Sequence, residues 1–130
     1  MSGINNTKPS VHIHEANASP THISEICAGL EEEGILYVIF KANGDAKTLA
    51  NEAANSSRLR VGIGITAEYA ILQIRNTPID MPVINQDAKT REVNIQERNP
   101  VLHIKLDYQN PPCRALGTNA ARAVKGVTFI

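Results

Sequence analysis

Hydrophobic and polar residues follow two different periods along this chain, and each change of period marks an expected helix or strand. The first helical stretch has apolar residues at i, i+3, i+4 and i+7, namely Ile23, Ile26, Cys27 and Leu30. Ser19 is suited to cap this helix, with Pro20 at its first position, and Gly34 is suited to the left-handed residue beyond its end. The pattern predicts a helix that begins at Pro20 and ends just before Gly34.

Four shorter stretches have either the period of two or the continuous apolar character that is typical of strands. They cover residues 11–16, 35–42, 61–66 and 69–76. The stretch 35–42 is almost wholly apolar, which predicts a strand that is covered on both faces of a sheet. The stretches 61–66 and 69–76 lie close enough in sequence to pair with each other in antiparallel fashion.

The helical period returns in two further stretches. Asp45 is a suitable N-cap for the first of them, which has a small inner face. That face comprises Ala46, Leu49, Ala50, Ala53 and Ala54. The last helix begins at Pro111-Pro112 and is closed by Gly126. Its apolar stripe comprises Leu116, Ala120, Ala123 and Val124.

The order strand–helix–strand–helix–strand–strand–helix predicts a single α/β domain. The crossovers are long enough to make the first three strands parallel, in a mostly parallel sheet with helices on both faces. Residues 1–10 are polar and are expected to form a flexible N-terminus. Residues 91–96 and 101–106 both alternate, and Val83-Ile84 fits a short strand. Residues 85–110 are therefore expected to form a hairpin or loop excursion.

Two glycines, Gly62 and Gly64, lie on one face of the third expected strand. A phosphate-binding loop would require a further glycine at the start of a helix, and none follows here. Glycines on one face of a strand also allow another backbone to approach closely. We therefore expect a helix to cross the sheet at these glycines.

His12 and His14 share one face of the first expected strand. Such a pair could bind zinc if further ligands were available, but His22 and His103 do not have ligand spacing. The pattern favours partly buried, hydrogen-bonded histidines over a metal site.

Composition narrows the possible functions. Thirteen basic residues balance thirteen acidic ones, so no bulk charge favours nucleic acid or a membrane surface as a partner. Aromatic residues make up only 4% of the chain, which argues against base-stacking or sugar-stacking surfaces. No apolar run approaches the ~20 residues of a membrane span. The two cysteines, Cys27 and Cys113, form no disulfide framework, and this fits a reducing cytoplasm.

Glu31, Glu32 and Glu33 occupy the last turn of the first expected helix. The carbonyl groups at a helix C-terminus carry partial negative charge, so each carboxylate there costs on the order of 0.3–1 kcal/mol. Groups outside the helix are expected to compensate. On a helical wheel Glu32 points away from the apolar stripe, while Glu31 and Glu33 flank it. The run is either a solvated helix end or a surface that presents Glu32 to a cation or a partner.

Two motifs connect the sequence to a known family. Gly29-Leu-Glu-Glu-Glu-Gly-Ile35 lies near the start and Asn119-Ala-Ala-Arg-Ala-Val-Lys-Gly126 near the end. Together with Arg75-Asn-Thr-Pro78 and with Ser56-Ser57 before Val61-Gly-Ile63, they resemble the small subunit of the diol and glycerol dehydratase reactivating factors.

This resemblance implies a subunit without catalysis of its own. In this family a large subunit, related in fold to Hsp70-type chaperones, carries the ATPase, and two large and two small subunits are expected to assemble. The complex releases damaged cobalamin from an inactivated dehydratase, so that intact adenosylcobalamin can enter. The small subunit resembles part of the dehydratase medium subunit and is thought to exchange places with it.

The resemblance also implies a role for the acidic run. The middle glutamate, which is Glu32 here, is expected to contact a divalent metal, magnesium, that is held by the large subunit. Glu31 and Glu33 would then lie at the same partner interface. The chain is expected to have no cofactor of its own. A single carboxylate contributed across an interface suits a hard cation that prefers oxygen ligands.

Two other functions belong to different classes. The same motifs occur in the dehydratase medium subunit, a structural part of an enzyme that contacts cobalamin. The third alternative is a stand-alone enzyme. The sequence shows neither a Cys/His or Ser/His/Asp set at recognisable spacing nor a complete nucleotide loop, so we expect the isolated chain not to bind ATP.

Overall fold

The computed structural model describes residues 8–75, 101–106 and 111–125 of the chain. These residues form a mixed five-stranded sheet and three helices. The strands are β1 (Val11–Ala16), β2 (Tyr37–Lys41), β3 (Val61–Thr66), β4 (Tyr69–Ile74) and β5 (Val101–Lys105). The helices are α1 (Pro20–Glu32), α2 (Ala46–Ser56) and α4 (Cys113–Lys125).

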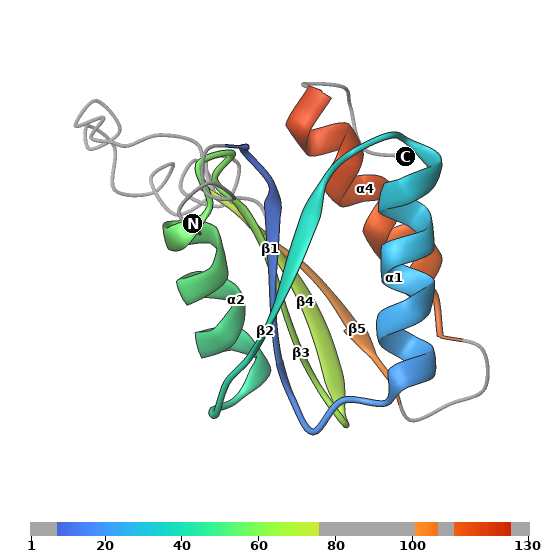
Figure 1. Ribbon diagram of the computed structural model, residues 1–130. Coiled ribbons are helices and arrows are strands. Elements are labelled where there is room, and N and C mark those ends of the chain that lie inside the picture. The colour runs from blue at the N-terminus through green and yellow to red at the C-terminus, as the bar shows by residue number, and fades with distance from the viewer. Residues whose placement is uncertain (1–7, 76–100, 107–110, 126–130) are drawn as a thin grey trace, which may run out of the picture.

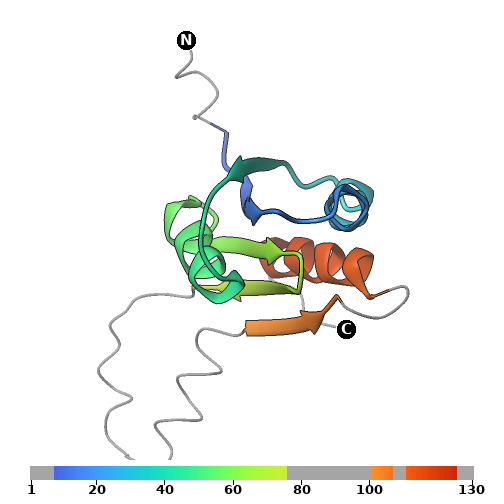
Figure 2. The ribbon, with the colours of Figure 1, turned by 90° about the horizontal axis from the view of Figure 1, so that it is seen from below.

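The sheet has the strand order β2-β1-β3-β4-β5. β1 runs parallel to β2 and to β3, whereas β4 is antiparallel to β3 and to β5. Helix α2 covers one face of the sheet, and α1 and α4 lie together on the other face (Figures 1 and 2). The α/β class, the parallel arrangement of the first three strands and the helices on both faces are confirmed.

Local sequence signals set the ends of the first two helices. The Ser19 hydroxyl accepts a hydrogen bond from the Thr21 amide, and the Asp45 carboxylate accepts one from the Thr48 amide. Gly34 has a φ of 74°, a conformation that costs glycine little. The helix boundaries predicted from these caps are confirmed, because capping depends on a few neighbouring residues.

The main core lies between the sheet and the pair α1 and α4. Its largest fully buried side chains include Ile13, Ile26, Leu30, Ile63, Ile65, Leu72 and Leu116. On the opposite face α2 approaches β3 at the two glycines. A Cβ atom on Gly64 would lie 2.3 Å from the Ala46 carbonyl oxygen, and one on Gly62 would lie 2.1 Å from the Ala54 nitrogen. The predicted close approach of a helix is confirmed.

β2 differs from the prediction. The apolar run around it was expected to be covered on both faces, but β2 is an edge strand that pairs with β1 alone among the described strands. Leu36, Val38, Ile39 and Phe40 are 53%, 41%, 42% and 41% exposed. The expectation of coverage is wrong because the helices pack over the middle of the sheet and leave this edge open.

β5 differs as well. Residues 101–105, which were expected to belong to an excursion, form a strand of the main sheet, with Tyr69 opposite Lys105 and Ala70 opposite Ile104. The prediction of a hairpin or loop excursion is therefore wrong for this part of residues 85–110. The rest of that interval, apart from Leu106, lies outside the described residues, as do the expected strands at 83–84 and 91–96.

The two histidines of β1 lie on the face of the sheet that α2 covers. His12 Nδ1 is 2.7 Å from the Ser56 hydroxyl oxygen, and the Phe40 ring packs against both imidazoles. His14 Nδ1 is buried without a hydrogen-bond partner, so of the two Nδ1 atoms only that of His12 is hydrogen-bonded as expected. Burial lowers the pKa of both rings. Among the described residues, no three His, Cys, Asp or Glu side chains are grouped so that they could hold a metal ion.

Candidate functional site

Two glycines bring α1 and α4 into direct backbone contact. A Cβ atom on Gly29 would lie 2.3 Å from the Arg114 carbonyl oxygen. A Cβ atom on Gly117 would lie 2.1 Å from the Ile26 carbonyl oxygen. Any larger residue would force the helices apart. The motif that begins at Gly29 therefore lies beside the helix that carries most of the Asn119–Gly126 motif (Figure 1).

Glu32 is bound to α4. The Arg114 guanidinium donates from Nη1 to Glu32 Oε2 at 3.0 Å and from Nε to Glu25 Oε1 at 3.0 Å. The Glu32 side chain is 54% exposed, as its position on the helical wheel suggests. The helical wheel did not reveal Arg114 as the partner of Glu32. Glu32 and Glu25 both lie on the side of α1 that faces α4, where Arg114 binds them.

Glu33 is bound to the other end of α4. The Lys125 ammonium donates to Glu33 Oε1 at 2.7 Å. This hydrogen bond and the charge of Lys125 hold the pKa of the Glu33 carboxyl below its usual range, and the charge of Arg122 acts in the same direction. Basic residues at the end of α4 thus stabilise that helix and neutralise the end of α1.

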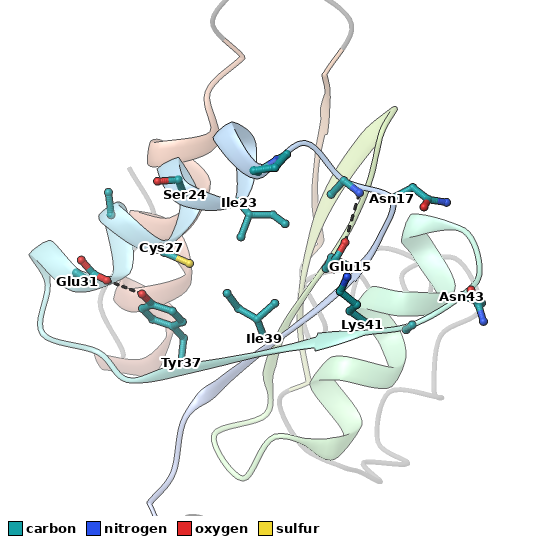
Figure 3. Close-up of a pocket in the computed structure, with 14 residues that line it drawn as sticks. Glu15, Asn17, Ile23, Ser24, Cys27, Glu31, Tyr37, Ile39, Lys41 and Asn43 are labelled. Atoms are coloured by element: carbon teal, nitrogen blue, oxygen red, sulfur yellow. Dashed lines mark hydrogen bonds between the residues drawn. The ribbon is translucent and has the colours of Figure 1, made fainter.

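Glu31 points to the opposite side of α1 and accepts a hydrogen bond from the Tyr37 hydroxyl of β2 (Figure 3). This hydrogen bond is the main cause that raises the pKa of Tyr37. All three glutamates have a partner from outside the helix, so the predicted compensation is confirmed. We refer to Glu31, Glu32 and Glu33 as the acidic end.

A groove of about 820 Å³ runs between α1 and β2, next to the acidic end (Figure 3). Ile23 and Cys27 of α1 and Ile39 and Tyr37 of β2 face into it. Sequence reasoning missed this groove, although the apolar run of residues 35–42 carried a signal: an apolar strand at an edge leaves side chains uncovered. Burial raises the pKa of the Cys27 thiol, so that it is a poor nucleophile at neutral pH.

The acidic end is suited to binding rather than to bond breaking. Each carboxylate is held in place by a different residue, Glu31 by β2 and the other two by α4. The thiol near Glu31 is that of Cys27, whose pKa is raised. The other cysteine, Cys113, is buried, and its pKa is raised to about 11. The site can present negative charge to a cation or to a basic partner surface.

Comparison with known proteins identifies the family. The family model described as "Dehydratase medium subunit" matches residues 8–94. The chain belongs to this dehydratase medium subunit family. The matched segment contains β1 to β4, α1 and α2.

Within the dehydratase medium subunit family, this chain is most informatively compared with reactivating factors. It is 33% identical over 129 residues to the propanediol dehydratase-reactivating factor small subunit of Citrobacter freundii, covering 96% of this chain and 93% of that protein. A structure of diol dehydratase-reactivating factor complexed with ADP and Mg²⁺ contains a similar chain, with a TM-score of 0.71 and 25% identity over 95% and 98% of the two chains. A chain of a glycerol dehydratase reactivase is also similar, with a TM-score of 0.69 and 26% identity. The match covers 95% of this chain and 97% of that chain.

These similarities confirm the family resemblance that was drawn from the two motifs, and they extend over nearly the whole chain. They do not test the roles of Glu31, Glu32 and Glu33, which remain predictions. In the part of the chain that the structure describes, no helix is both long and apolar enough to cross a membrane.

Proposed function

We propose that this chain is the non-catalytic small subunit of a dehydratase-reactivating factor. With an ATPase large subunit, it would release damaged cobalamin from an inactivated adenosylcobalamin-dependent diol or glycerol dehydratase. The observation that carries the proposal is the match, over nearly their full length, to proteins named reactivating factor small subunits. A small subunit implies a large one, and two copies of each are expected in the assembly.

Subunit exchange is supported by the family itself. The family model is described as a dehydratase medium subunit, whereas the full-length relatives are reactivating factor small subunits. One fold would then serve in both the client enzyme and the factor. A small subunit with the fold of the medium subunit could take its place against the other dehydratase subunits and so open the cobalamin site.

The acidic end is the proposed contact with the large subunit. Glu32 would complete the coordination of a magnesium ion held by that subunit, with Glu31 and Glu33 beside it. Magnesium takes six oxygen ligands and commonly uses one or two carboxylates, so a single glutamate suits this role. The exposed ion pair with Arg114 contributes about 0–1 kcal/mol, so little opposes the movement of Glu32 toward a cation.

The test compares Glu32→Gln with matched variants in binding to the cognate large subunit. Glu32→Gln should weaken binding about tenfold or more in magnesium buffer, and the loss should shrink when the metal is chelated. Glu25→Gln is the matched control, because Glu25 shares the same Arg114 partner but lies away from the helix end. Glu31→Gln and Glu33→Gln should have smaller effects.

The stability of the isolated chain should hardly change in Glu32→Gln. The substitution removes an unfavourable charge at the helix end and a surface ion pair, two effects of about 1 kcal/mol or less and of opposite sign. Equal binding by all four variants in the presence of magnesium would show that the acidic end is only a solvated helix end.

The dehydratase medium subunit itself is the second candidate, because the family model carries that description. A medium subunit should retain corrinoid when it is purified with its enzyme partners, and its preparation should be coloured. A reactivating factor subunit should be colourless and should co-elute with the large subunit in gel filtration.

A further inference from the structure

Among the described residues, β2 presents an edge of the sheet that has little of the usual protection. Natural edge strands avoid pairing with other chains by means of charges, prolines, bulges or a covering element. β2 has an apolar centre, contains no proline and carries one charge, Lys41, at its end. No described strand pairs with its outer side, and both of its faces are partly exposed.

The hydrogen-bond pattern determines which backbone groups face outward. The Val11 amide donates to the Leu36 carbonyl, and the Ala42 amide donates to the Glu15 carbonyl. In a parallel pair, alternate residues of one strand direct both the N–H and the C=O toward the neighbour. Leu36, Val38, Phe40 and Ala42 therefore face β1, and Tyr37, Ile39 and Lys41 direct their N–H and C=O groups away from the sheet.

The side chains beside this edge offer binding space on each face. Toward α1, an added strand would direct alternate side chains into the groove that Ile23, Cys27 and Ile39 line (Figure 3). Toward α2, its other side chains would meet Val38 and Phe40. Strand addition typically combines these two features, since the main chain provides affinity and pockets for alternate side chains provide specificity.

We infer that β2 accepts an extended, apolar segment of the reactivating factor large subunit as a sixth strand of the sheet. This inference rests on the proposed function, because the large subunit is the partner which that function requires. Continuity of surface supports this occupant: the Tyr37 hydroxyl of β2 is hydrogen-bonded to Glu31, so the edge and the acidic end form one surface. Glu31 adjoins Glu32 in the last turn of α1, so a subunit seated on the acidic end would lie next to the start of β2.

Amide hydrogen exchange tests the pairing directly in the complex of the full chain with its cognate large subunit. The amides of Tyr37, Ile39 and Lys41 should exchange rapidly in the free chain and at least a hundredfold more slowly in the complex. The amides of Val38 and Phe40, which already donate to β1, serve as internal controls and should be protected in both states.

A pair of variants tests the same contact by binding. Ile39→Pro removes an outward N–H without breaking a hydrogen bond to β1, whereas Ile39→Ala keeps that N–H and loses the same side chain. The proline variant should bind the large subunit at least tenfold more weakly than the alanine variant. Equal binding by the two variants would overturn main-chain pairing.

Three other outcomes would also overturn the inference, and they are distinguishable. A complex that forms while the three outward amides still exchange rapidly would leave the proposed function intact and remove strand addition. Failure of any complex to form would remove both. Protection of these amides in the free chain, with the mass of a dimer, would show that a second copy of the chain occupies the edge.

Discussion

At the scale of single residues, the acidic end shows how three adjacent carboxylates can be held without mutual repulsion dominating. Glu31, Glu32 and Glu33 point to three different partners, on β2 and at two places on α4. The need for compensating groups could be predicted from the sequence, because the unfavourable position of carboxylates at a helix C-terminus depends only on the helix itself. The identity of the partners was not predictable, since Arg114 lies 82 residues from Glu32 and a helical wheel contains no information about a second helix.

The pair Glu33–Lys125 makes a prediction about pH. Because the folded state lowers the pKa of Glu33, its stabilising contribution is present above the usual pKa of a glutamate and is lost as the pH falls through the lowered value. Lys125→Met should raise the pKa of Glu33 toward its usual range and leave only the smaller dependence that the charge of Arg122 causes. An NMR titration of the Glu33 side-chain carboxyl measures the change, with Arg114→Met as a control that should leave Glu33 nearly unaffected. An unchanged Glu33 titration in Lys125→Met would show that this ion pair does not persist in solution.

At the scale of the elements, local signals and long-range packing differ in what they reveal. The caps at Ser19, Gly34 and Asp45 are short-range, and the helices they delimit were predicted correctly. An apolar run does not say whether its strand is central or at an edge, so β2 was misplaced. The role of β5 was also missed, because its partner β4 precedes it by a long stretch of chain.

The contact between α2 and β3 can be tested at Gly64. Gly64→Ala should destabilise the fold by about 1–3 kcal/mol or more, because the new Cβ atom would meet backbone atoms of Ala46 and Ala50 that cannot rotate away. Ile63→Val, a change on the opposite face of the same strand, should cost only about 0.5–1.5 kcal/mol. Chemical denaturation midpoints compare the two. An unchanged midpoint in Gly64→Ala would mean that α2 does not pack on this face.

At the scale of the whole molecule, the two faces of the sheet are covered in different ways. Helix α2 comes directly before β3, the strand that it covers most closely, so that layer is built from neighbouring segments. The other layer requires α1 from the start of the chain and α4 from its end. Gly29 and Gly117 allow the backbones of α1 and α4 to touch, so the two helices pack as one layer.

A truncated chain tests this dependence. Residues 1–110 lack α4, so Ile26, Leu30 and the sheet face beneath them lose part of their cover, and cooperative unfolding should be lost. Adding a peptide of residues 111–125 should restore at least part of it. The measurement is urea denaturation followed by circular dichroism, and a cooperative transition in the 1–110 chain alone would contradict the expected dependence.

The joining of α1 to α4 also affects how the protein is made. A ribosome adds about 5–20 residues per second, so the 82 residues between Glu32 and Arg114 separate the synthesis of the two partners by about 4–16 s. During that interval the glycine surface of α1 and the carboxylates of Glu32 and Glu33 lack their partners on α4. The growing chain is therefore most open to chaperone binding before its last helix emerges, and rare codons ahead of α4 would lengthen that period.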